Sequence, residues 1–240
     1  PAVTIQGNAQ EATWTTQADW LALDNPTTTF WLNEQTLSTN ATENAPLTTF
    51  KDDGVAAFRA QKISTAAWQD ALIADQSSFT GNRLRFLGSP LTEPLIIDGR
   101  IQFRTRVAVN AERGLLSVLV IDYGQFNRLG TTPAVLAAKG QQLGYQWRYD
   151  DLKEFKLNRP SNYQVITKGH INLQNRHNSY QTDAVTPNEF YDITLDLQPT
   201  HQLGLLVYAT DMGMTIREEQ AFVYQVDLAA SQLIVPHLND

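Results

Sequence analysis

The stretch LGLLVYATDMGMTIR, residues 203–217, begins as an apolar segment and ends with side chains that could do chemistry, Asp211, Thr215 and Arg217. The first part is apolar at consecutive positions, which predicts a strand that is covered on both faces. In the loop that follows, Asp211 and Arg217 can pair with each other or cap backbone groups. The pattern therefore favours a buried strand with a structured loop over a catalytic site.

The sequence does not predict a nucleophile elsewhere. The Gly-x-Ser-x-Gly elbow of α/β-hydrolases does not occur in it. Ser89 lies in a Gly-Ser-Pro turn, and Ser117 lies inside an apolar strand pattern, where a packed hydroxyl is the simpler interpretation. The chain has no cysteine, which excludes a thiolate nucleophile and a disulfide. We therefore expect no catalytic residue in this chain.

Metal and cofactor motifs are also missing from the sequence. Asp52-Asp53-Gly54 lacks the later oxygen ligands of a calcium loop and is interpreted as a turn. Nothing in the spacing fixes an acid–base pair among Asp122, Asp150, Asp151 and Asp211. No His-x-His or His-Glu-x-x-His motif contains any of the four histidines, His170, His177, His201 and His237. We expect no metal ligand and no cofactor.

Five tryptophans leave a sugar-binding hypothesis open, because flat aromatic faces stack on sugar rings. Burial in a core or an interface is the more common role of tryptophan. The residues concerned are Trp14, Trp20, Trp31, Trp68 and Trp147.

Charge argues against a polyanionic partner. The net charge is −7, and the first 50 residues contain five acidic residues and no Lys or Arg. Such a surface repels phosphate backbones, so we expect no nucleic acid partner. The acidic start is interpreted as a solvated face, with a docking face for a basic partner as the alternative. No apolar run is long enough to cross a membrane, and no signal peptide is visible. The absence of cysteine fits a cytosolic protein, so we expect a cytoplasmic protein.

The elements that would position these residues are mostly strands. Apolar and polar residues alternate in residues 100–109, 190–197 and 221–228, as in half-buried strands. Residues 110–113 are predicted to be a hairpin loop before a central strand at 114–124. Further strands are expected at 27–32, 55–61, 82–88, 163–175 and 203–210. One helix is predicted at 65–75, with weaker helical patterns at 131–140 and 148–155.

This pattern predicts an all-β fold, an antiparallel jelly-roll β-sandwich with a few short helices. We expect a single domain over residues 1–240, in which 1–60 form a less regular lead-in and 61–240 form the sandwich.

Four blocks of the sequence resemble, in order, the C-terminal domain of bacterial X-prolyl dipeptidyl peptidases, most closely those of lactic acid bacteria. They are residues 98–124, 152–178, 190–200 and 203–217, within a similarity that covers about 82–236. One departure is that LQPT at 197–200 passes directly to His201, where the family usually has a longer turn.

The resemblance implies a galactose-binding-like jelly roll without catalytic residues. In that family the Ser-Asp-His triad belongs to an upstream α/β-hydrolase domain, which releases X-Pro dipeptides from peptide N-termini, and the enzymes are cytoplasmic homodimers. The expected partners are therefore the upstream domain, its proline-containing peptide substrate and a second copy. The expected function is a non-catalytic accessory domain that packs on the hydrolase and shapes substrate access. The alternatives are a carbohydrate- or ligand-binding module and a docking element with an exposed apolar patch.

Overall fold

The computed structural model describes residues 3–6, 14–17, 25–41, 44–62, 64–73, 80–91, 95–132, 154–197, 203–213 and 219–237. The chain divides into two compact units. The smaller unit consists of Pro1–Asp24 and Tyr123–Gln164, and the larger unit consists of Asn25–Asp122 and Val165–Asp240. Two long strands contribute residues to both units, β8 (Leu115–Thr132) and β9 (Glu154–Asn172).

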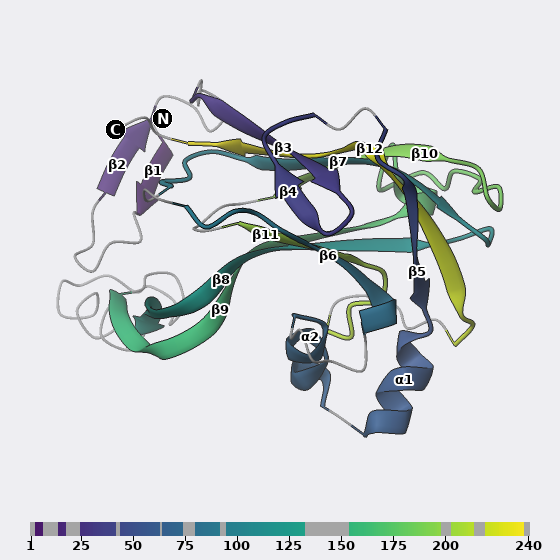
Figure 1. The fold of residues 1–240 in the computed structure, drawn as a ribbon, viewed down its shortest axis with the longest axis horizontal. Coiled ribbons are helices and arrows are strands. Elements are labelled where there is room, and N and C mark those ends of the chain that lie inside the picture. The colour runs from purple at the N-terminus through teal and green to yellow at the C-terminus, as the bar shows by residue number, and fades with distance from the viewer. Residues whose placement is uncertain are drawn as a thin grey trace. The chain divides into compact units, whose positions relative to one another are not determined.

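A ten-stranded sheet forms the larger unit. Its other strands are β3 (Thr27–Asn33), β4 (Thr36–Ser38), β5 (Leu47–Asp52), β6 (Arg83–Leu87), β7 (Ile101–Val109), β10 (Tyr191–Leu197), β11 (Gly204–Tyr208) and β12 (Phe222–Pro236). The strand order is β10-β7-β12-β3-β4-β6-β11-β8-β9, and β5 pairs with β12. Figure 1 shows β3, β7, β10 and β12 in one layer and β6, β8 and β11 in the other. The predicted all-β sandwich is confirmed.

One pairing departs from the expected antiparallel pattern. β4 and β6 meet in parallel at Thr36 and Leu87. The pairings with a defined register are otherwise antiparallel. The short β4 therefore joins the strands of one layer to those of the other.

The core lies between the layers. It is formed by the apolar side chains that occupy every second position of the strands and point inward. In β10, Ile193, Leu195 and Leu197 are buried while the residues between them are exposed. β11 is buried at all of its positions, as its continuous apolar run predicts. Tyr224 of β12 connects the two layers, because its hydroxyl accepts a hydrogen bond from the backbone N–H of Leu115 at 3.0 Å.

Two helices, α1 (Gly54–Gln61) and α2 (Thr65–Ile73), lie between β5 and β6 in the sequence. The C-cap residue of α1 is Lys62, which has a left-handed backbone (φ 52°). α2 begins after Ser64, whose Oγ accepts a hydrogen bond from the N–H of Ala67 at 3.1 Å, as an N-cap does. No helix in the described part of the chain is long and apolar enough to cross a bilayer.

The predicted strand at residues 55–61 is wrong, because this segment forms α1. Its alanines, arginine and glutamine favour helix, and a segment this short shows no decisive alternation. The helical spacing brings Val55 and Phe58 to one face, and Val55 is buried. Phe58 meets the Trp68 ring of α2 edge-on, with 6.3 Å between the ring centroids.

The predicted hairpin at residues 110–113 is also wrong. β7 pairs with β10 and β12, whereas β8 pairs with β11 and is the neighbour of β9. The connection therefore crosses between the two layers. Asn110 fixes it to β12, because its N–H donates to the carbonyl of Val223 at 3.1 Å and its Oδ1 accepts from the N–H of Val223 at 2.8 Å.

In the smaller unit, β1 (Val3–Gln6) and β2 (Trp14–Gln17) form an antiparallel pair. Arg128 of β8 ties the long ribbon together. Its guanidinium donates to the carbonyl and the hydroxyl of Ser161 on β9, and to the carbonyl of Gly124 at 2.7 Å. The helical patterns expected at 131–140 and 148–155 lie almost entirely outside the described residues.

Candidate functional site

Asp211, the residue that could carry chemistry at the end of β11, is held by neutral donors and one lysine. Its Oδ2 accepts a hydrogen bond from the Tyr208 hydroxyl at 2.9 Å, and its Oδ1 accepts one from the N–H of Gly213 at 2.8 Å. The Nζ of Lys168 lies 3.9 Å from Oδ2. Asp211 is itself buried.

This geometry suits a structural cap. Burial raises the pKa of Tyr208 far above its usual range, and the adjacent carboxylate of Asp211 raises it further. Tyr208 is therefore a permanent hydrogen-bond donor and cannot act as a base near neutral pH. The expectation that Asp211 caps backbone groups is confirmed by its bond to Gly213, while Thr215 and Arg217 lie outside the described residues.

A second buried network joins the loop after β11 to three other elements. The Thr210 hydroxyl donates to Oδ2 of Asp52 on β5 at 2.9 Å. The carbonyl of Thr210 accepts from the indole Nε1 of Trp68 on α2 at 3.0 Å. Next to it, the Ser117 hydroxyl of β8 donates to the carbonyl of Ala209 at 2.6 Å. Ser117 is thus the packed hydroxyl that the sequence predicted.

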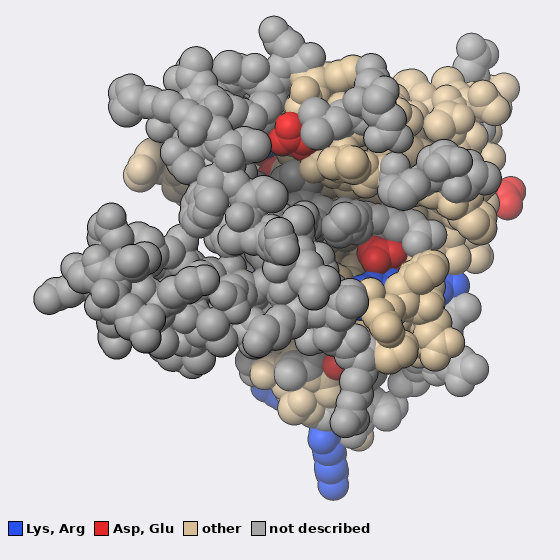
Figure 2. Space-filling model, turned by 90° about the vertical axis from the view of Figure 1, so that its left-hand side faces the viewer, with Lys and Arg blue, Asp and Glu red and all other residues tan. Residues whose placement is uncertain are grey.

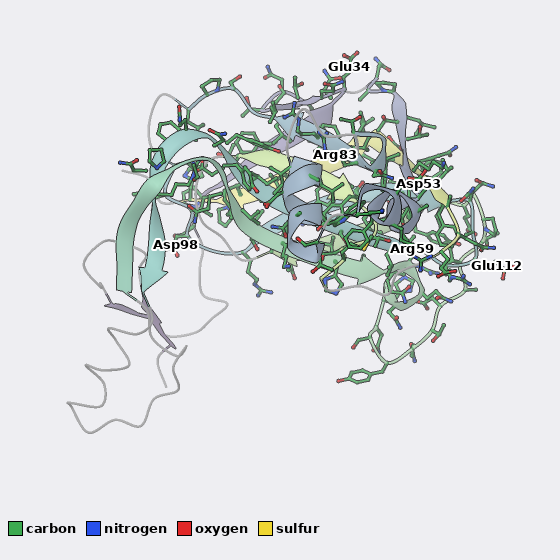
Figure 3. All side chains as sticks on the ribbon, turned by 90° about the horizontal axis from the view of Figure 1, so that it is seen from below. Glu34, Asp53, Arg59, Arg83, Asp98 and Glu112 are labelled. Atoms are coloured by element: carbon green, nitrogen blue, oxygen red, sulfur yellow. The ribbon has the colours of Figure 1, made fainter. Side chains whose placement is uncertain are left out.

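Instead of the turn expected at Asp52-Asp53-Gly54, Asp52 ends β5, Gly54 begins α1 and Asp53 is the N-cap residue between them. The carboxylate of Asp53 binds neighbouring side chains. Its Oδ2 lies 2.7 Å from the Nζ of Lys51, and its Oδ1 accepts from the Nδ2 of Asn82 at 2.6 Å. Burial acts to raise the pKa of Asp53, but the hydrogen bonds from Lys51 and Asn82, together with the charge of Lys51, outweigh it and lower the pKa. Figure 3 labels Asp53 beside the helical segment.

The structure does not bring the histidines together in the residues that it describes. His170 is exposed on β9, His177 pairs with Asp183 in a surface loop, and the Nε2 of His237 lies 3.0 Å from the Thr28 hydroxyl. His201 lies outside the described residues. Across the described ranges, no three His, Cys, Asp or Glu side chains are grouped to hold a metal ion.

The remaining candidate acids and nucleophiles are also dispersed. Ser89 is exposed after β6, and Asp122 is buried on β8. Asp150 and Asp151 lie outside the described residues. On the face shown in Figure 2, the described acidic and basic side chains are scattered and form no continuous patch.

Two of the five tryptophans have described side chains. Trp68 is buried, and its indole is already bonded to Thr210, so it cannot stack on a free ligand. Trp31 is half-buried in β3, between β4 and β12. The side chains of Trp14, Trp20 and Trp147 lie outside the described part of the chain, where the sugar-binding hypothesis stays a prediction.

A groove of about 390 Å³ lies between the β3–β4 turn, the start of β5 and β6. No serine, cysteine or histidine is among its described lining residues, so nothing there forms a nucleophile–base pair. Glu34 lies at the outer edge in Figure 3, whereas Arg83 lies further inside. The lining residues are Glu34, Gln35, Pro46, Leu47, Thr48, Thr80, Arg83, Leu84, Arg85 and Leu228.

Comparison with known proteins decides the family. Residues 1–238 match the model of the X-Pro dipeptidyl-peptidase C-terminal non-catalytic domain. The chain belongs to this family. Xaa-Pro dipeptidyl-peptidases from Ligilactobacillus salivarius and Pediococcus pentosaceus are 35% and 38% identical to it, over 98% and 97% of the chain. The chain spans only 30% and 31% of the length of these two relatives.

Two solved structures share the fold. An α-amino acid ester hydrolase matches 94% of the chain and 39% of its own, with a TM-score of 0.55 and 16% identity. An aminopeptidase from a marine sediment archaeon of the Thaumarchaeota matches 94% of the chain and 38% of its own, with a TM-score of 0.58 and 13% identity. In both, the matching region is a part of a longer protein.

Membership of the X-Pro dipeptidyl-peptidase C-terminal domain family agrees with the chemistry of the described residues. The polar groups that the sequence singled out bind backbone and neighbouring side chains, as Asp211, Thr210 and Asp53 do. Sequence reasoning missed the Trp68–Thr210–Asp52 network, because its members come from three distant segments. The only local signal was the tryptophan within the predicted helix.

Proposed function

We propose that this chain is the accessory domain of an X-Pro dipeptidyl-peptidase and that it packs on the peptidase part of the same polypeptide. The observation that carries the proposal is the family match over residues 1–238, together with relatives of which the chain spans about 30%. The two compact units act as one functional domain, because that match covers both of them. In this role the domain supplies stability and shapes access to the substrate.

The peptidase part is a serine hydrolase of the α/β type that removes X-Pro dipeptides from peptide N-termini. Support for this comes from the names of the relatives and from the sequence resemblance. The parent enzyme works in the cytoplasm as a homodimer, and the domain itself needs no cofactor.

Two measurements test the proposal. The chain on its own, at any concentration, releases no p-nitroaniline from an X-Pro-p-nitroanilide substrate. The parent enzyme without this domain unfolds at a lower temperature than the intact enzyme, because the docked surface is then exposed to water. Turnover by the purified chain, or a truncated parent that is as stable as the intact enzyme, would contradict it.

A further inference from the structure

Residues 174–183 begin within the 3₁₀ turn η2 (Leu173–Asn175), precede β10 and form a surface loop whose two ends meet. The N–H of Asp183 donates to the carbonyl of Gln174 at 2.7 Å. The side-chain Nδ2 of Asn175 donates to the carbonyl of Gln181 at 2.8 Å. A compact loop with joined ends is an Ω-loop, a class that is frequently functional.

Tyr180 lies at the outer turn of this loop. Its N–H donates to Oδ1 of Asn178 at 2.8 Å, and the next N–H, that of Gln181, donates to the carbonyl of Asn178 at 3.3 Å. These bonds hold the backbone, whereas the side chain is left in solvent, with Tyr180 94% exposed. The loop therefore presents a large ring from a fixed backbone, which lowers the ordering cost of binding.

The chemistry around the ring is that of a recognition loop. The exposed neighbours of Tyr180 are uncharged and polar, Asn178, Ser179, Gln181 and Thr182. Tyrosine supplies rigid contact area, and small polar residues supply adaptable hydrogen bonds, the combination found in antibody binding loops. The tip carries no formal charge, so it suits an uncharged surface with an apolar pocket and a polar rim.

The charged residues of the loop lie at its base and are engaged there. His177 pairs with Asp183, with 3.1 Å between Nδ1 and Oδ2. The guanidinium of Arg176 donates to the carbonyl of Leu173 at 2.9 Å and lies 4.3 Å from the centre of the Tyr191 ring. These contacts hold the base of the loop against β10 and η2. The outer turn, which carries Tyr180, contains no charged residue.

The size of the loop decides which partner it fits. A stable complex between separate proteins buries about 800 Å² on each side, from roughly 20–30 residues, which a single loop does not supply. Interfaces between domains of one chain are smaller and more polar. A covalent tether also provides an effective concentration in the millimolar range, at which a weak contact is populated. In the relatives the rest of the polypeptide, about 70% of its length by difference from the 30% that the chain spans, is such a tethered partner.

We propose that the loop at residues 174–183 contacts the peptidase part of the same polypeptide and inserts the Tyr180 ring into an uncharged apolar pocket there. The proposal rests on the proposed function, in which the domain packs on that part. It assigns one specific contact to that packing.

Hydroxyl-radical footprinting of the intact parent enzyme tests this contact without a mutation. Oxidation of Tyr180, followed by mass spectrometry of its peptide, should be at least five-fold slower in the native enzyme than in the urea-unfolded enzyme. The protection should not change when the enzyme is diluted. Equal rates in the two states would overturn the proposal, and protection that disappears on dilution would assign the loop to a second copy of the chain instead.

Variants of the intact parent provide the second measurement. Tyr180→Ala should lower its midpoint of thermal unfolding by several degrees, whereas the control Thr182→Ala on the same loop should shift it by less than one degree. An unchanged midpoint of thermal unfolding in Tyr180→Ala would contradict the insertion of the Tyr180 ring into a pocket. If Tyr180 is not protected from oxidation but removal of the whole domain still destabilises the parent, the proposed Tyr180 contact is wrong. The proposal that the domain packs on the peptidase part then remains.

Discussion

The indole Nε1 of Trp68 on α2 donates a hydrogen bond of 3.0 Å to the carbonyl of Thr210, 142 residues further along the chain. Both residues are buried, and Thr210 also donates its hydroxyl to Asp52 on β5. The bond therefore fixes α2 to the sandwich through the loop after β11. A buried carbonyl has no access to water, so it depends on this donor.

Trp68→Phe should lower the free energy of unfolding by about 2 kcal/mol, because it leaves the carbonyl of Thr210 without its indole donor and removes part of a packed ring. Urea denaturation followed by circular dichroism measures the change. The matched control is Trp31→Phe, since Trp31 is only half-buried in β3. The control should cost no more than about 1 kcal/mol. Equal costs for the two variants would show that the indole–carbonyl bond contributes nothing.

The strands could be predicted where apolar and polar residues alternate, because the alternation determines which face of the strand is buried. The burial of β10 follows its period-two pattern at every position, and that of β7 follows it as far as Val107. In β12 the alternation holds to Leu228 and changes phase at the irregularity that follows. α1 was not predictable in this way, because its few residues satisfy a short strand pattern as well as a helix. The hairpin between β7 and β8 failed for a different reason. A turn-like sequence does not reveal whether the next strand pairs with its neighbour or crosses to the other layer.

For the candidate sites, the sequence predicted local roles but not distant partners. The bond from Gly213 to Asp211 and the ion pair between Lys51 and Asp53 join residues that are close in sequence. The bond between Trp68 and Thr210 depends on the register of strands that are far apart in the chain, which no local pattern encodes.

Thr210→Val should destabilise the domain by about 1.5–3 kcal/mol, because it removes the hydroxyl that donates to the buried carboxylate of Asp52 while keeping the shape of the side chain. Chemical denaturation at pH 7 measures the effect. Arg59→Ala is an informative contrast, since it breaks an ion pair to Glu219 with both side chains mostly exposed. That variant should change stability by less than about 1 kcal/mol. A larger cost for Arg59→Ala than for Thr210→Val would contradict this account.

The contribution of Asp53 should depend on pH. Its pKa is lowered on folding from the usual value of 3.8, so its charge stabilises the folded state above about pH 4, and this stabilisation is lost as the pH falls through the folded pKa. Asp53→Asn should therefore be less stable than the unmodified chain at pH 7. Solvent screens the partly exposed pair with Lys51, so the difference should be about 0.5 kcal/mol.

Near pH 2.5 the stabilities of Asp53→Asn and the unmodified chain should converge. Urea denaturation at the two pH values measures this. A difference for Asp53→Asn that stays constant down to pH 2.5 would mean that its charge is not involved.

Gly124→Ala should destabilise the β8–β9 ribbon, because Gly124 has a φ of +117° and an added Cβ would come within 2.6 Å of the Phe126 ring. The left-handed backbone and the clash together should cost about 1–3 kcal/mol. The bond from Arg128 to the carbonyl of Gly124 should weaken as well, since it requires the same backbone geometry. Gly81→Ala is the matched control, because nothing lies within 4 Å of a Cβ added there. Hydrogen–deuterium exchange over 115–132 should accelerate in Gly124→Ala and stay unchanged in Gly81→Ala, and unchanged exchange in both would mean that the ribbon tolerates a side chain at this position.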